Sequence, residues 1–165
     1  MKAVILAGIS GSGKSTYLKE TGLASVSTDV YVENFGKDEG LNYSDAFDKI
    51  QELHLFKDFQ RLFYIDIEAN IKGGVDFAID RTNLTVGYRA KLIADLKELA
   101  EKYSQTLIIE CISFDLPLPE IKERLKKREA ETGKSIPEEV IDNQFKAYEK
   151  PTDEEDFDKL VALNA

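Results

Sequence analysis

The chain has little cysteine, and it lacks long hydrophobic runs. Its 165 residues include one cysteine, Cys111, so no disulfide can form within the chain, as is usual in a reducing compartment. No segment approaches the ~20 apolar residues that a membrane-spanning helix needs, and the apolar run after Lys2 is too short for a signal peptide. We therefore expect a cytoplasmic protein with no membrane partner, in which Cys111 is a buried thiol within an apolar segment.

Acidic residues outnumber basic ones, 31 to 22, and there is one histidine. The formal net charge is −9 at pH 7, whereas proteins that bind long stretches of nucleic acid are usually basic over much of their surface. Any phosphate-bearing partner must therefore be small, or must bind at a local basic patch. The single histidine, His54, is flanked by leucines, which indicates a packing or surface residue rather than a catalyst.

Short apolar runs alternate with helical patterns along the chain. The apolar runs predict strands at 3–7, 23–27, 75–80 and 106–113. Apolar spacing predicts a helix beginning at Lys14, one long helix over 44–71, helices over 87–103, 117–131 and 138–150, and a short tail element at 153–163. This alternation predicts one α/β domain over 1–165, a three-layer αβα fold with a parallel sheet of four to five strands.

The segment GISGSGKST, at 8–16, lies between the first predicted strand and the first predicted helix. It fits the pattern G-x-x-x-x-G-K-[ST] of the P-loop NTPases. Its glycines let successive N–H groups point into one concavity, and the following helix adds its free N–H groups and the positive end of its dipole. Lys14 would reach the β- and γ-phosphates of ATP, and Ser15 would bind Mg²⁺. The predicted ATP-binding residues here are Gly8, Ser10, Gly11, Ser12, Gly13, Lys14, Ser15 and Thr16.

Two aspartates end predicted strands, and ligands of such sheets bind at the carboxyl edge. Asp29 follows the second strand, where it could accept the proton of a hydroxyl that attacks the γ-phosphate. Alternatively, Thr28 or Asp29 could cap a helix. Asp80 ends the third strand and could hold Mg²⁺ through water, together with Ser15.

The segment DRTNLT, which begins at Asp80, and the aromatic residues after Asp29 supply candidate contacts to an acceptor. Arg81 and Arg89 would place positive charge near the same edge, whereas Thr82 or Asn83 could instead cap the next helix. Tyr31 could stack on an acceptor base, or it could pack beneath its loop. The predicted acceptor-binding set is Asp29, Tyr31, Arg81, Thr82, Asn83 and Arg89.

Basic residues cluster in the segment IKERLKKREAETGKSIPEEV. One interpretation is a helical lid at approximately 122–137 that lends charge to the transferring phosphoryl group and excludes water. Arg124 and Arg128 would then contact the ATP phosphates, with Lys134 as a further cation. The other interpretation is a solvated helix face with Glu–Lys pairs four residues apart.

Taken together, the segments GISGSGKST, STDVY, DRTNL, RLKKRE and FKAYEKPTDEEDFDKL resemble the 5′-hydroxyl polynucleotide kinases. The similarity runs in order from Lys2 to about Leu160 and covers the kinase domains of the phage enzyme and the animal repair enzyme, which are small P-loop kinases with an adenylate-kinase-like fold. It implies ATP-dependent phosphorylation of a 5′-OH end of DNA or RNA. Asp29 would be the general base, and Arg128 would be a lid arginine.

The chain departs from that family mainly on the acceptor side. The phage enzyme has an arginine for the acceptor phosphate three residues beyond its base aspartate, and this position is Val32 here. Several lid arginines are replaced by lysine or acidic residues. A kinase of a hydroxymethylated DNA base, a nucleoside or another small molecule therefore stays open, as does a regulatory ATPase. No N-K-x-D signature of a guanine-specific GTPase is present.

Overall fold

A computed structural model describes residues 1–163, and five parallel strands form its sheet in the order β2-β3-β1-β4-β5. The strands are β1 (Lys2–Ala7), β2 (Ala24–Val26), β3 (Phe77–Asp80), β4 (Ile108–Phe114) and β5 (Lys159–Leu163). The central strand β1 is a continuous apolar run because helices cover both of its faces. The predicted α/β class, with a five-stranded parallel sheet, is confirmed.

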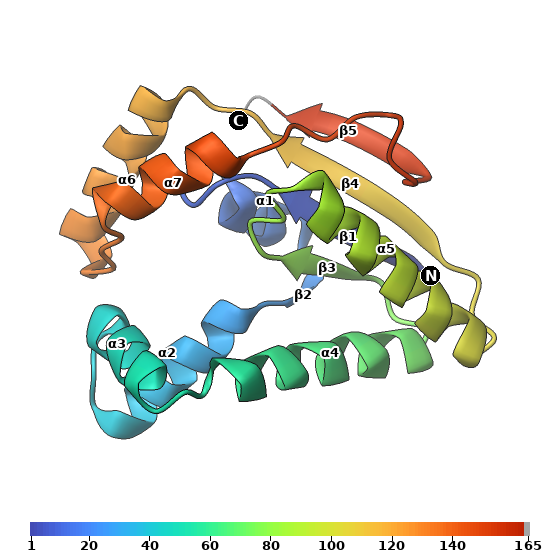
Figure 1. Cartoon of the computed structure of the whole chain (residues 1–165), viewed down its shortest axis with the longest axis horizontal. Coiled ribbons are helices and arrows are strands. Elements are labelled where there is room, and N and C mark those ends of the chain that lie inside the picture. The colour runs from blue at the N-terminus through green and yellow to red at the C-terminus, as the bar shows by residue number, and fades with distance from the viewer. Residues whose placement is uncertain (164–165) are drawn as a thin grey trace.

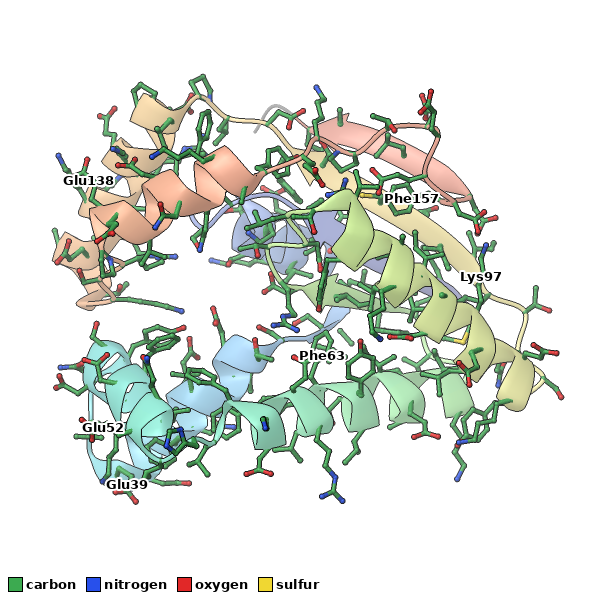
Figure 2. All side chains as sticks on the ribbon, viewed as in Figure 1. Glu39, Glu52, Phe63, Lys97, Glu138 and Phe157 are labelled. Carbon is green, nitrogen blue, oxygen red and sulfur yellow. The ribbon has the colours of Figure 1, made fainter. Side chains whose placement is uncertain are left out.

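Seven helices are present in the described part of the chain. They are α1 (Lys14–Thr21), α2 (Thr28–Glu39), α3 (Tyr43–Glu52), α4 (Phe56–Lys72), α5 (Val86–Lys102), α6 (Leu118–Thr132) and α7 (Glu138–Ala147). Helices α4 and α5 cover one face of the sheet, where Phe63 and Leu96 are fully buried in its core (Figure 2). On the other face, Tyr17 and Leu18 of α1 pack against Leu6 and Phe114. Within residues 1–163, no helix has the length and apolar character required to span a bilayer.

The remaining helices lie beyond the carboxyl ends of the strands, α2 and α3 on one side and α6 and α7 on the other (Figure 1). A small apolar cluster that includes Val32 and Ile50 joins α2 to α3. Another cluster joins Ile9, at the end of β1, to Leu125 of α6 and Ile141 of α7. The second cluster positions α6 and α7 relative to the end of β1.

The single long helix predicted over 44–71 is wrong, because the chain breaks it into α3 and α4. His54 adopts φ 56°, in the left-handed region. The amide of His54 donates to the carbonyl of Gln51 at 3.1 Å, and the amide of Leu55 donates to that of Ile50 at 3.1 Å. This pair of bonds is a Schellman motif, which usually uses glycine at the left-handed position. The imidazole is exposed, in agreement with the surface role expected for His54.

The tail element predicted at 153–163 contributes the edge strand β5. The pairing of β5 with β4 begins at Asp158, which makes two hydrogen bonds to Ile109. The Asp158 carboxylate accepts a bond of 2.7 Å from the Ile109 amide, and the Asp158 amide donates to the Ile109 carbonyl at 2.8 Å. Cys111, in the middle of β4, is fully buried as expected. Desolvation raises the pKa of its thiol to about 12.

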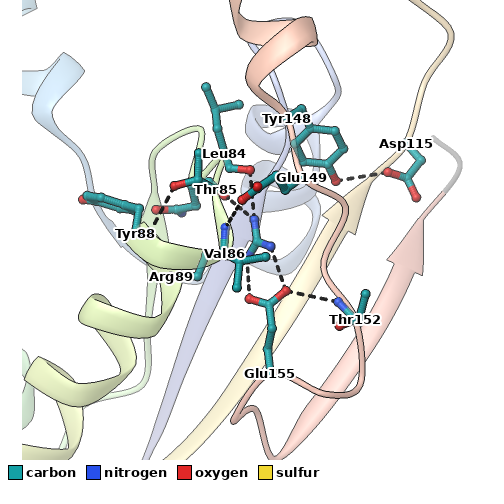
Figure 3. A network of polar contacts seen from close by, with 11 residues as sticks. Leu84, Thr85, Val86, Tyr88, Arg89, Asp115, Tyr148, Glu149, Thr152 and Glu155 are labelled. Carbon is teal, nitrogen blue, oxygen red and sulfur yellow. Dashed lines mark hydrogen bonds and ion pairs between the residues drawn. The ribbon is translucent and has the colours of Figure 1, made fainter.

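Arg89 is at the centre of a buried polar network (Figure 3). Its guanidinium makes two bonds of 2.7 Å to the carboxylate of Glu155 and donates to the carbonyls of Asn83 and Leu84 at 2.9 and 3.1 Å. The Glu149 amide also donates to the Leu84 carbonyl, at 2.9 Å. The network therefore ties the connection between β3 and α5 to the segment that precedes β5.

We expect Arg89→Met to lower the free energy of unfolding by about 3–5 kcal/mol, because Glu155 would remain as an unpaired buried carboxylate. The double variant Arg89→Met/Glu155→Leu should recover most of this loss. Lys97→Met is the matched control, because Lys97 pairs with the exposed Asp156 on the surface and should cost less than about 1 kcal/mol. Urea denaturation measures all three. Equal losses for Arg89→Met and Lys97→Met would contradict the structural role assigned to this network.

Candidate active site

A cavity of about 680 Å³ lies at the carboxyl ends of β1, β2 and β3. It brings together residues that the sequence separates widely: the loop after β1, the first turn of α2, the end of β3, and residues of α6, α7 and the connection between them. The predicted site residues that line it are Ser10, Gly11, Gly13, Lys14, Ser15, Thr16, Asp29, Asp80, Arg81, Thr82, Arg124 and Arg128.

The loop between β1 and α1 is held close to its neighbours. Gly11 and Gly13 have φ values of 83° and 110°, in the left-handed region that favours glycine. A Cβ atom on Gly11 would also lie 2.9 Å from Leu125 of α6. The Ser10 amide donates to the Gln144 side chain of α7 at 2.9 Å. The first amides of α1 have no partner within the helix, so the loop presents donors to an anion at the cavity.

Two other residues of the loop are buried and do not line the cavity. The Gly8 amide donates to the Thr82 carbonyl at 3.0 Å, which fixes the loop against the connection that follows β3. The Ser12 hydroxyl is buried without a hydrogen-bond partner in the described part of the chain. Gly8 and Ser12 therefore support the loop from behind its cavity-facing surface.

Lys14 is folded back onto its own loop. Its Nζ atom donates to the carbonyls of Gly8 and Ile9 at 2.8 and 2.9 Å. Desolvation lowers the pKa of Lys14 to about 8, although the carboxylates of Asp80 and Asp29 oppose this shift. The ammonium form therefore still predominates near pH 7 but is lost above about pH 8, and an anion in the cavity would favour the charged form.

Asp29 lies in the first turn of α2, with its side chain lining the cavity. The predicted cap at Thr28 or Asp29 is wrong: Ser27 caps α2, and its hydroxyl accepts from the Asp29 amide at 3.2 Å. The Asp29 carboxylate accepts a hydrogen bond of 3.0 Å from the Tyr43 hydroxyl and pairs with Lys134 at 3.6 Å. Because Ser27 supplies the cap, this carboxylate is available to the cavity.

Asp80 and Ser15 line the same cavity from β3 and α1. Desolvation raises the pKa of Asp80, and Lys14 acts in the opposite direction. One carboxylate and one hydroxyl suit Mg²⁺, which prefers oxygen ligands, keeps several waters and uses few protein groups. Within residues 1–163, no group of three or more His, Cys, Asp or Glu side chains is placed to bind a metal ion. The residues present therefore fit a Mg²⁺ ion shared with substrate phosphates.

Arg128 of α6 brings an unsatisfied cation to the cavity. Its Nε and Nη2 atoms are buried and have no hydrogen-bond partner within the described residues. Buried guanidinium donors are normally paired, so this side chain suits an anionic ligand. Arg124, one turn earlier, lines the cavity and donates to Glu120 at 2.8 Å.

The structure does not bring three of the predicted acceptor-binding residues to the cavity. Tyr31 points toward α4, where its hydroxyl donates to Asp66 and its ring packs on Phe59. Asn83 is buried, and its amide donates to the Leu6 carbonyl at 2.7 Å. Arg89 is fully buried against Glu155. For these residues the expected position at the cavity is wrong, because partners distant in the sequence bind each polar group inside the fold.

The cap expected at Thr82 or Asn83 is also wrong. Thr85 caps α5, with its hydroxyl accepting from the Tyr88 amide at 3.2 Å. Thr82 stays at the cavity, whereas the φ of 47° at Asn83 turns the chain away from it. Arg81 lines the cavity, and its Nη1 atom donates to Tyr88 and Gln60 at 2.8 and 2.9 Å.

Sequence reasoning missed a wall of the cavity on α3. We call this surface, formed by Tyr43, Ser44, Phe47 and Asp48, the α3 wall. The four residues look like part of an ordinary amphipathic helix, and no pattern in them indicates proximity to a strand end. Gln144 of α7 was missed for the same reason. The cap of α3 at Asn42, which accepts from the Asp45 amide at 2.9 Å, is the local signal that a new helix begins there.

The first strand of the parallel sheet leads through a glycine-rich loop into α1, which begins at Lys14. This arrangement defines a P-loop protein. The chain belongs to the AAA_33 family of P-loop kinases, whose model, described as an AAA domain, matches residues 4–151. None of the curated proteins matches the chain.

Several solved structures share the fold. A proposed kinase from Chloroflexus aurantiacus J-10-fl has a TM-score of 0.66 at 15% identity, with 98% of this chain and 84% of that chain covered. A gluconokinase from Sinorhizobium meliloti 1021 has a TM-score of 0.53 at 21% identity, with 98% and 81% covered. A fungal RNA kinase has a TM-score of 0.58 at 13% identity, with 99% and 74% covered. These likenesses establish a kinase-like P-loop fold.

Proposed function

We propose that the protein transfers the γ-phosphate of ATP to a hydroxyl group of an acceptor. The observation that carries this proposal is the composition of one cavity: Lys14 and the loop amides, the carboxylates of Asp29 and Asp80, and the unpartnered guanidinium of Arg128. A triphosphate needs the cationic donors, and a hydroxyl nucleophile needs a carboxylate base.

Each residue has a defined part in the proposed reaction. The loop amides and Lys14 bind the β- and γ-phosphates, and Ser15 with Asp80 would hold Mg²⁺, which supplies charge neutralisation when bound. Asp29 takes the proton of the acceptor hydroxyl. The new bond joins that oxygen to the γ-phosphorus, while the bond to the β–γ bridging oxygen breaks and ADP leaves. Arg128 stabilises the charge on the transferring group.

The segment 122–137 would act as the lid. Lys134, in the connection between α6 and α7, reaches across the cavity to α2, where its Nζ atom lies 3.2 Å from Glu33. It also lies 4.1 Å from the ring centre of Tyr43. Contacts of this kind would hold the segment over bound substrates and exclude water, which favours transfer over hydrolysis.

Two classes of acceptor are candidates. A 5′-OH end of DNA or RNA is supported by the resemblance to the polynucleotide kinases and by the fold shared with a fungal RNA kinase. A small hydroxyl-bearing molecule is supported by the fold shared with a gluconokinase. It is also supported by Val32, which is buried between α2 and α3 in the position of the family's acceptor-phosphate arginine.

The decisive experiment is single-turnover transfer from γ-labelled ATP. The acceptors are 5′-OH DNA, 5′-OH RNA, a set of nucleosides and gluconate, each with Mg²⁺. We expect label in an acceptor product. Label in nucleosides or gluconate but not in either polynucleotide would eliminate the 5′-end kinase. Acceptor-independent release of inorganic phosphate as the sole activity would contradict the transfer proposal and favour a regulatory ATPase.

The pKa of Lys14 makes nucleotide affinity depend on pH. Bound phosphates favour the ammonium form, so binding above pH 8 takes up a proton and the affinity falls as pH rises through about 8. We expect ATP to bind about tenfold more weakly at pH 9 than at pH 7. Titration calorimetry in buffers of different ionisation enthalpy measures the affinity and the proton uptake. A Lys14→Met variant should bind weakly with a flat profile, and an equal pH dependence in this variant would contradict the assignment.

A further inference from the structure

The two sides of the cavity carry opposite charge. The loop, α6 and the connection after α6 contribute Lys14, Arg124, Arg128 and Lys134. Helices α2 and α3 lie on the other side (Figure 1), and their contribution includes two carboxylates, Asp29 and Asp48. No cation of α2 or α3 lines the cavity in the described chain. A triphosphate is therefore favoured on the first side, and a second anion beside α3 is not.

Two cations that reach toward the acceptor side, Lys134 and Arg81, are already engaged. Lys134 pairs with Glu33 at 3.2 Å and with Asp29 at 3.6 Å. Arg81 donates to Gln60 and Tyr88 through Nη1, and its guanidinium lies 5.0 Å from the ring centre of Phe63. Lys134 also lies 4.1 Å from the ring centre of Tyr43, so a cation does contact the α3 wall, although two carboxylates already pair with it. No side chain of the wall itself is positively charged, and Asp48 contributes a carboxylate there.

The α3 wall also presents aromatic surface to the cavity. Phe47 is 39% exposed and lines the cavity, so its ring offers apolar contact area to a bound molecule. Its ring stacks at 6.5 Å on Tyr43, which holds Asp29 through its hydroxyl, and contacts Phe56 at 5.0 Å. Tyr43 therefore links the ring of Phe47 to the carboxylate assigned as the base.

We infer that the α3 wall is the acceptor subsite for a hydroxyl compound with an aromatic or apolar body and no phosphate group at that position. This inference rests on the proposed function, because the hydroxyl concerned is the one that Asp29 deprotonates. Phe47 supplies the surface for the body of the acceptor. Asp48 repels an anion there and accepts hydrogen bonds from a neutral or cationic acceptor.

The test uses three small probes with the same ring: benzyl alcohol, benzylamine and benzyl phosphate. Each is titrated into the full-length ¹⁵N-labelled protein saturated with Mg²⁺ and a non-hydrolysable ATP analogue, so that the phosphate side is occupied. We expect the alcohol and the amine to shift the amides of 43–48, and benzyl phosphate to bind at least about tenfold more weakly than the alcohol. Phe47→Ala should abolish all three responses.

Charge reversal provides the control. Asp48→Lys should tighten benzyl phosphate at the α3 wall by at least about tenfold. Glu52→Lys makes the same change of charge on the same helix, at an exposed position that does not line the cavity. It should leave the order of the three probe affinities unchanged (Figure 2).

The inference is overturned if benzyl phosphate binds the wild-type protein as tightly as the alcohol does, or if no probe shifts the amides of 43–48. Failure of the ATP analogue to bind would instead contradict the proposed function. Repeating the probe titrations without the analogue would then test the α3 wall separately.

Discussion

Asp29→Asn should lower the rate of phosphoryl transfer by at least ~10²-fold, because the amide cannot take the proton of the acceptor hydroxyl. Nucleotide affinity should change little, since the loop amides and Lys14 bind the triphosphate independently of this carboxylate. The substitution is nearly isosteric, and its oxygen can still accept from the Tyr43 hydroxyl. Single-turnover transfer and calorimetric titration of the ATP analogue separate the two effects.

Asp38→Asn is the matched control for this variant. Asp38 lies on the same helix, is exposed and does not line the cavity, so its replacement should leave transfer unchanged. If Asp29→Asn retained wild-type transfer, Asp29 would not be the base. If it lost nucleotide binding together with the folded state, Asp29 would be a structural residue of the α2 N-terminus.

Lys14→Met should reduce turnover by at least ~10²-fold and should weaken nucleotide binding as well. The two effects should occur together because, in the proposed mechanism, Lys14 would contact the phosphates in the ground state and in the transition state. The variant should fold normally, since methionine removes an ammonium whose burial is unfavourable, as the lowered pKa shows.

Lys19→Met, on the exposed face of α1, controls for loss of charge from the same helix. Its turnover and its ATP affinity should match those of the wild type. Thermal unfolding of both variants checks that the fold is intact. Normal ATP affinity in a folded Lys14→Met protein would show that the loop does not bind the triphosphate through this side chain.

Local sequence was sufficient to predict where the glycine-rich loop of the proposed nucleotide site lies. The spacing of glycines, Lys14 and Ser15 directs the backbone amides and the lysine to one place, and the structure has this loop between β1 and α1 as predicted. Asp80 was also placed correctly at a strand end, beside β1 in the sheet. Such features depend on residues close together in the chain and on the parallel direction of the strands.

Charged and aromatic side chains were harder to place, because residue type does not tell which partner a side chain meets. Arg81 and Arg89 look equivalent in the sequence. One lines the cavity, and the other is buried because Glu155, 66 residues away, reaches it. Tyr31 likewise points toward α4, where its hydroxyl donates to Asp66. These outcomes depend on long-range contacts that no local spacing encodes.

By itself, the sequence determined the parallel αβα fold, the P-loop motif after β1, and the placing of Asp29 and Asp80 near the carboxyl edge of the sheet, because each follows from periodicity or from a short motif. Only the tertiary structure decided what faces those aspartates. The break at His54 turns α3 back so that Phe47 and Asp48 form a wall of the cavity. Folding brings that wall beside Asp29 through packing of α2 on α3, and packing depends on the combined shape and burial of distant side chains.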